Sequence, residues 1–67
     1  MELIDTPNPN AKKILFNQEN KDLSQSLERV EGVSSVFSGP GFITITKENK
    51  FDWEEITEDI VNIFDKL

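Results

Sequence analysis

The chain has 67 residues, contains neither cysteine nor histidine, and carries a net charge of −6 from 13 acidic and 7 basic side chains. This length predicts a single domain, residues 1–67, with a small core. The lack of thiols and imidazoles excludes Ser-His-Asp and Cys-His nucleophile systems, as well as metal centres built from those ligands. The acidic balance argues against nucleic acid and anionic membranes as partners, because both bind lysine and arginine.

The first ten residues, MELIDTPNPN, contain neither the basic segment nor the apolar segment of a signal peptide. No apolar run in the chain approaches the roughly 20 residues that a membrane-spanning helix needs. We therefore expect a soluble cytoplasmic protein, or a domain of one, that has no membrane partner. We also expect the protein to be a monomer.

Two short strands, at residues 2–5 and 11–16, are predicted to flank a rigid loop. The loop cannot continue a strand, because its two prolines lack backbone donors and its two asparagines favour turns. Its members are Thr6, Pro7, Asn8, Pro9 and Asn10. A structural role, in which the loop sets the register between the strands, is favoured over recognition of a partner protein. We keep the loop as a candidate partner-binding site.

Residues 21–31 have the apolar spacing of a helix. Leu23, Leu27 and Val30 fall at positions i, i+4 and i+7, so they form one stripe along it. Gly32 follows the last expected turn, as is typical of the residue that ends a helix in the left-handed conformation.

Residues 33–38 and 42–47 are predicted to form a β-hairpin. Gly39, Pro40 and Gly41 interrupt two runs that are rich in β-branched and aromatic residues, which is a strong turn signal. In the second run isoleucines alternate with threonines, so that strand has one apolar face and one hydroxylated face.

The last helix is predicted to begin with Asp52 as its N-cap and Glu55 at the third helical position, the spacing of a capping box. An apolar stripe then repeats to the end of the chain and places the only tryptophan in the core. The stripe consists of Trp53, Ile56, Ile60, Ile63, Phe64 and Leu67.

The other face of this helix is acidic. It carries Glu54, Glu55, Glu58, Asp59 and Asp65. Carboxylates one turn apart could bind a divalent cation weakly or dock a basic partner, but a solvated face is the favoured interpretation. We keep the first four of these residues as candidate partner-binding residues and predict no metal site.

The element order ββαββα requires no parallel crossover. We therefore predict an α+β fold of two layers, in which a four-stranded, mainly antiparallel sheet is covered by two helices on one face. The other sheet face then has no helix over it. Phe37, Phe42 and Phe51 either form an exposed apolar patch on that face or join the core, and both alternatives stay open.

Three segments together resemble a known family. They are Thr6-Pro7-Asn8-Pro9-Asn10-Ala11-Lys12, GVSSVFSGPGFITITKE at residues 32–48, and Asp52-Trp53-Glu54-Glu55. In their sequence and order they resemble the N-terminal domain of the Nfu/NifU-type iron–sulfur cluster scaffold proteins. In this family a separate C-terminal domain with a CxxC motif binds the cluster.

The resemblance implies a non-catalytic domain that contacts proteins of iron–sulfur cluster assembly and delivery, including a CxxC domain of the same parent protein. Because this chain has no cysteine, we expect it to bind no cluster or other cofactor itself. Two alternatives stay open. The chain could be a stand-alone adaptor of an unrelated pathway that shares the fold, or a small enzyme that uses carboxylates alone.

Overall fold

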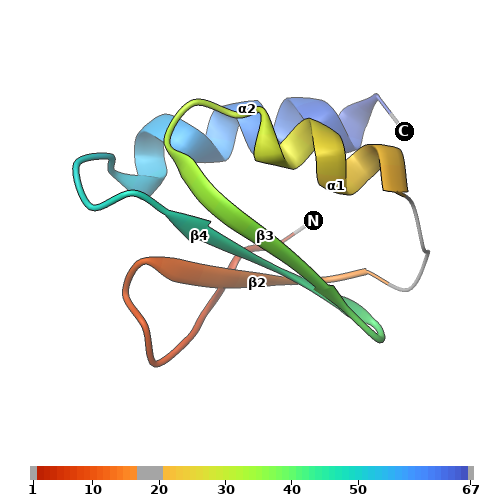
Figure 1. Cartoon of the computed structure of the whole chain (residues 1–67), viewed down its shortest axis with the longest axis horizontal. Coiled ribbons are helices and arrows are strands. Elements are labelled where there is room, and N and C mark those ends of the chain that lie inside the picture. The colour runs from red at the N-terminus through yellow and green to blue at the C-terminus, as the bar shows by residue number, and fades with distance from the viewer. Residues whose placement is uncertain (1, 17–20, 67) are drawn as a thin grey trace.

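A computed structural model describes residues 2–16 and 21–66 of the chain. The elements are β1 (Ile4–Asp5), β2 (Ala11–Leu15), α1 (Lys21–Glu28), β3 (Val33–Gly39), β4 (Phe42–Lys47) and α2 (Trp53–Asp65). The strands form one sheet in which all neighbours are antiparallel. Both helices lie on the same side of this sheet (Figure 1). The predicted two-layer α+β architecture is confirmed.

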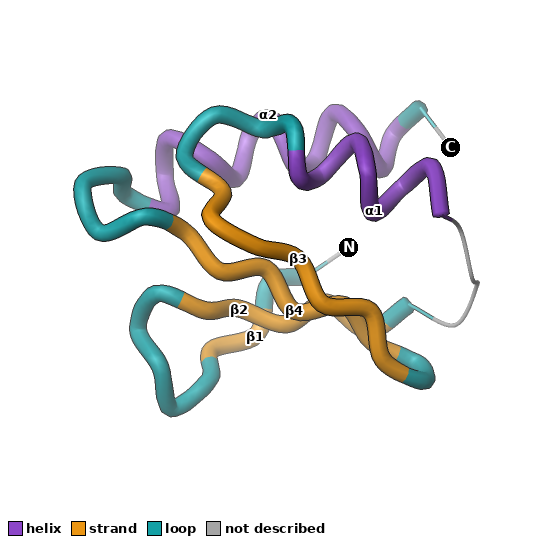
Figure 2. The backbone as a smooth tube through the Cα atoms, in the orientation of Figure 1, coloured by secondary structure: helices purple, strands orange, loops and turns teal. Residues whose placement is uncertain are grey.

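The strand order is β1-β2-β4-β3, so the last strand in sequence lies inside the sheet (Figure 2). Since β2 and β3 are both antiparallel to β4, they run parallel to each other without being neighbours. The connection between them is α1, which makes this a split β-α-β arrangement. The β3–β4 hairpin closes through Pro40 and Gly41, and Gly41 has the positive φ of 78° that such a turn requires.

The core lies between the sheet and the two helices. Register places Ile14 beside Ile43 on one side of the sheet, and Ile45 is paired with Val36 on that same side. The helices face these side chains. The buried cluster consists of Ile14, Leu23, Leu27, Ile43, Ile45, Ile56 and Ile60. The stripes predicted for both helices therefore point inward, as expected.

α1 ends earlier than predicted, at Glu28 rather than at residue 31. The reason is that its last turn tightens: the Val30 amide donates to the Leu27 carbonyl at 3.2 Å, a bond from residue i to i−3. Gly32 then turns the chain with a φ of 96°. A Cβ atom there would lie 2.8 Å from Cγ of Phe51, so both the backbone angle and the packing require glycine.

α2 begins as predicted and ends two residues before the end of the chain. The Asp52 amide donates to the Glu55 carboxylate at 3.0 Å, which satisfies one of the donors that a helix start leaves unpaired. Lys66 is the C-cap. The predicted contribution of Leu67 lies outside the described residues.

The strand boundaries also differ in part from the prediction. β1 has two residues instead of four and pairs with β2 only through Ile4 and Asp5. Phe16 follows β2 rather than ending it, yet it reaches the helical layer, where its ring meets that of Phe64 edge-on at 5.4 Å. No helix within residues 2–16 and 21–66 is both long enough and apolar enough to cross a membrane.

We expect Ile60→Ala to lower the free energy of unfolding by about 2–5 kcal/mol, because the isoleucine is fully buried between α2 and the sheet. In a domain of this size such a loss removes most of the stability. Glu58→Ala, on the exposed side of the same helix, should change it by only about 0.5 kcal/mol. Thermal and urea melts measure both, and equal melting of the two variants would contradict the assigned helix faces.

Candidate functional site

The loop at residues 6–10 is folded onto itself by side-chain hydrogen bonds. The Thr6 hydroxyl lies 2.9 Å from the Asn8 carbonyl and 2.8 Å from the Ala11 carbonyl, and it accepts the Asn8 amide at 3.2 Å. The side-chain oxygen of Asn8 accepts the Asn10 amide at 2.9 Å. These contacts give the loop a defined shape that does not depend on a partner.

The same loop is also fastened to the start of α2 and to the end of β4. The Trp53 indole donates to the Pro9 carbonyl at 3.0 Å. The Lys47 ammonium donates to the side-chain oxygen of Asn10 at 3.1 Å, and the Asn10 side-chain amide donates to Asn49. The loop and the first turn of α2 are therefore neighbours, although no pattern in the sequence predicted that they lie together.

Trp53 is half-buried rather than enclosed in the core as predicted. One part of its ring packs against the buried cluster, while its N–H reaches out to the loop. The Lys12 ammonium lies 5.5 Å from the centre of the ring and also 3.2 Å from an Asp5 carboxylate oxygen. Tryptophan suits this position because it combines an apolar body with one polar donor.

An open cleft of about 420 Å³ lies between the loop and Trp53. Its lining residues are Asp5, Thr6, Pro7, Asn8, Pro9, Ala11, Lys12 and Trp53. The lining offers carbonyl oxygens, an indole face and one lysine, but no cysteine, histidine or buried carboxylate. This chemistry suits contact with another polypeptide, because it provides shape and hydrogen bonds without an activated nucleophile or base.

The acidic residues predicted on α2 are all exposed: Glu54, Glu55, Glu58, Asp59 and Asp65. Glu55 is partly used in capping the helix, where its carboxylate accepts the Asp52 amide. Within the described part of the chain, no three acidic side chains come together in a way that could hold a metal ion. The remaining acids offer a partner exposed negative charge and hydrogen-bond acceptors.

The side of the sheet opposite the helices carries a third feature, which the sequence left open. Phe37 and Phe42 lie there with ring centres 6.1 Å apart, while Phe51 packs against the core instead. Leu15 lies on this side too and is 66% exposed. Sequence reasoning missed it, although its position directly after the inward-facing Ile14 places it on the opposite face by strand alternation.

Comparisons with known proteins agree with this fold. The sequence model of the family described as "Scaffold protein Nfu/NifU N terminal" matches residues 17–67. The human "NFU1 iron-sulfur cluster scaffold homolog, mitochondrial" is 40% identical over 84% of this chain and 29% of the human protein. "Conserved virulence factor C" of Staphylococcus aureus (strain MRSA252) is 31% identical over 88% of this chain and 20% of that protein. The chain thus spans less than a third of these two relatives.

Two solved structures are similar over nearly the whole chain. The crystal structure of protein SAV1430 from Staphylococcus aureus has a TM-score of 0.85 at 25% identity, and the match covers 96% of this chain and 95% of that one. The solution structure of SeR13 from Staphylococcus epidermidis has a TM-score of 0.63 at 30% identity, covering 98% and 94%. With the family match over more than half of its length, the chain belongs to the Nfu/NifU N-terminal scaffold family.

Proposed function

We propose that this chain is a non-catalytic interaction domain in iron–sulfur cluster assembly and delivery, and that it does not hold the cluster itself. One observation carries the proposal: a member of a scaffold family has neither cysteine nor histidine. Iron–sulfur clusters are held by thiolates, with imidazole as the usual substitute. The donor set of this chain therefore does not fit a cluster, and we treat the cluster as cargo bound by a partner.

A catalytic role has less support. Every described aspartate and glutamate is exposed to solvent, and no polar or charged side chain is buried within the described ranges. General acid–base catalysis by carboxylates usually depends on an apolar, water-poor site that holds one of them. These observations favour an interaction domain over the carboxylate enzyme.

We assign the contact with cluster-assembly proteins to the end of the molecule where the loop meets α2. The loop presents a fixed backbone and is joined to the start of α2 by Trp53, and the first two turns of that helix carry the exposed acids Glu54, Glu58 and Asp59. A rigid backbone favours affinity, because little conformational entropy is lost on binding. Exposed carboxylates add long-range steering of a basic partner, which salt screens.

The partner implied by the family is a CxxC domain of the same parent protein, together with cluster donors and recipients. The compartment stays a prediction: we expect the cytoplasm, and the human relative carries "mitochondrial" in its name. A stand-alone adaptor of another pathway is the competing function, and binding to cluster-assembly proteins is what separates the two.

Anaerobic reconstitution of the isolated chain with iron and sulfide, followed by desalting, should leave a colourless protein. The reason is that the chain offers no thiolate or imidazole to retain the cluster. Visible absorption and iron and sulfide analysis measure the outcome. A stable visible band with stoichiometric iron and sulfide would overturn the proposal that the chain carries no cluster.

NMR titration of the labelled chain with the CxxC domain, cysteine desulfurase and scaffold protein of its own organism should perturb residues 6–10 and the start of α2. We expect weak binding that fades as salt rises, because exposed charges drive the encounter. The double variant Glu54→Gln/Glu58→Gln should weaken it several-fold. The control Glu28→Gln/Glu31→Gln removes the same charge from exposed positions outside α2 and should change affinity much less.

Each result of this titration has a defined meaning. Equal weakening by both double variants would show that net charge matters but not the position of the acids. No perturbation with any of the three proteins at near-millimolar concentration would favour the unrelated adaptor.

A further inference from the structure

The sheet face that points away from the helices, here called the open face, carries a continuous apolar patch. Register places Leu15 beside Phe42 and Phe42 beside Gly39, while Phe37 lies one row away beside Thr44. The Phe42 ring leans over Gly39, where a Cβ atom would come within 2.4 Å of it. The patch therefore extends across β2, β4 and β3 without a side chain interrupting it at Gly39.

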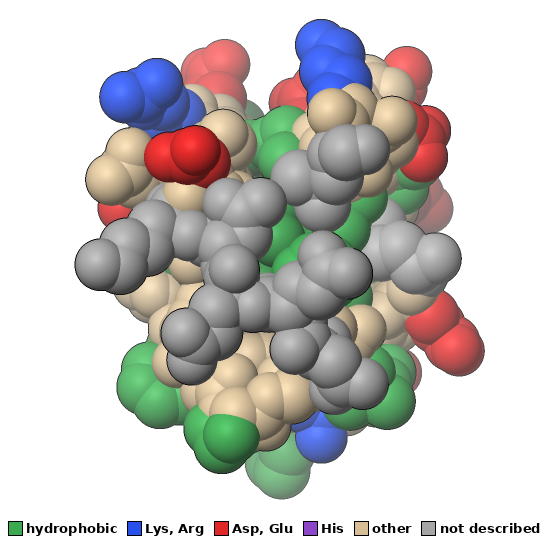
Figure 3. All heavy atoms as spheres, turned by 90° about the vertical axis from the view of Figure 1, so that its right-hand side faces the viewer, with side chains coloured by type: hydrophobic (Ala, Val, Ile, Leu, Met, Phe, Trp, Pro, Cys, Tyr) green, Lys and Arg blue, Asp and Glu red, His purple; other side chains and the backbone are tan. Residues whose placement is uncertain are grey.

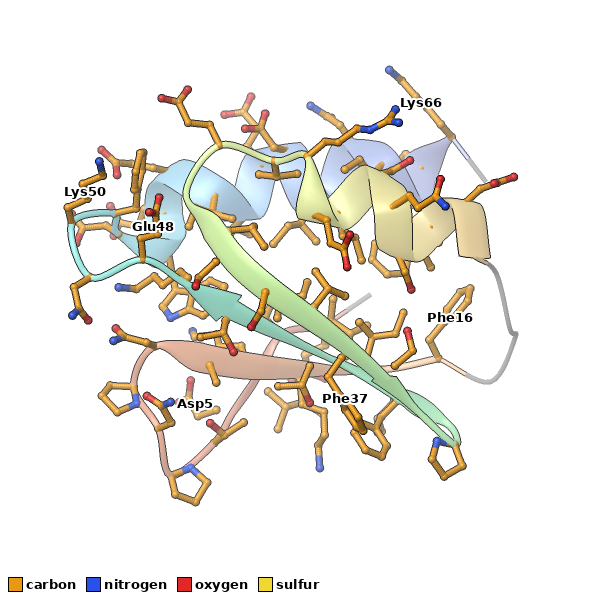
Figure 4. The ribbon with its side chains drawn as sticks, viewed as in Figure 1. Asp5, Phe16, Phe37, Glu48, Lys50 and Lys66 are labelled. Atoms are coloured by element: carbon orange, nitrogen blue, oxygen red, sulfur yellow. The ribbon has the colours of Figure 1, made fainter. Side chains whose placement is uncertain are left out.

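The large apolar side chains of this patch are exposed to solvent. Leu15 is 66% exposed, Phe37 is 63% exposed, and Phe42 is half-buried. Phe37 points away from the helical layer, whereas Phe16 points toward it (Figure 4). Large apolar side chains gathered at one exposed place are uncommon on a monomer's surface and typically mark a protein interface.

The charge on the open face differs from that of the rest of the chain. Among the strand residues on this face, Lys13 is the charged one. It lies beside Thr44, and Phe37 lies on the other side of Thr44. The described acids lie in the helices, turns and termini, except Asp5, which pairs with Lys12 in the row that faces the helices. Figure 3 shows hydrophobic side chains along the sheet side of the molecule and most acids over the helical side.

This distribution of charge indicates which kind of partner the open face fits. A second copy is disfavoured, because face-to-face packing of two open faces would place two Lys13 ammonium groups in one interface and supply no carboxylate from the strands to either. A basic partner would be repelled by Lys13 and would leave it without a counter-charge. A segment with apolar anchors and one carboxylate complements both the patch and the lysine.

We propose that the open face is a second docking surface, which binds an apolar segment of another protein through Leu15, Phe37 and Phe42, with an aspartate or glutamate of that segment at Lys13. This surface lies on the opposite side of the sheet from the helices, so α2 stays uncovered when it is occupied. The domain can therefore contact two proteins at once. The proposal goes beyond the function assigned above and does not depend on it.

Selection of a random peptide library, displayed on phage, against the immobilised chain tests the proposal directly. Enriched peptides should combine two or more large apolar residues with at least one aspartate or glutamate. NMR titration with the synthesised peptides should perturb Lys13, Leu15, Phe37 and Phe42. Phe37→Thr keeps a good strand former at this exposed position and should weaken binding by about tenfold, as expected for an interface anchor.

Charge reversal gives the second criterion. Lys13→Glu should weaken the binding of acidic peptides by about tenfold. Peptides in which the acid is replaced by lysine should restore the affinity of this variant. Two matched controls lie off the open face: Val61→Thr removes an exposed apolar side chain from α2, and Lys50→Glu reverses an exposed lysine. Neither should change binding, and circular-dichroism melts confirm that all four variants are folded.

Several outcomes would overturn the proposal. They are enrichment of basic peptides that map to α2, binding that survives Phe37→Thr, equal effects of Lys13→Glu and Lys50→Glu, or no enrichment at all. Sedimentation that shows a dimer lost in Phe37→Thr would assign the face to a second copy instead.

Discussion

The burial of one sheet face by two helices is the interaction on which the rest of this molecule depends. Seven aliphatic side chains from β2, β4, α1 and α2 form the buried cluster, and the chain has no disulfide to assist it. A chain of this size can build only one such core. Both helices are needed to cover one side of the sheet, so its other side is left to solvent or to partners.

The loop at residues 6–10 depends on the same core. Trp53 opens α2, packs against the buried cluster and donates its N–H to Pro9, so the helix that closes the core also holds the loop. The candidate binding end is thus built on a helix that is itself packed against the core. Binding surfaces supported in this way lose little conformational entropy when a partner arrives.

Local patterns predicted most of the fold and less of the candidate site. The hairpin and both helix stripes follow from residue spacing within a single element, which short segments determine by themselves. The bond from Trp53 to Pro9 joins residues 44 positions apart, and no local pattern encodes it. The face on which Leu15 lies, by contrast, follows from strand alternation after Ile14, and its exposure follows because the helices cover only the other face.

Two adjacent residues of β2 test the central claim, that one sheet face carries the stability and the other is available for contact. Ile14 is 1% exposed beneath the helices, and Leu15 is 66% exposed on the open face. Denaturant unfolding of Ile14→Ala should show a loss of about 2–5 kcal/mol, whereas Leu15→Ala should lose less than about 1 kcal/mol. Equal losses would contradict the account, because they would show that both faces are part of the core.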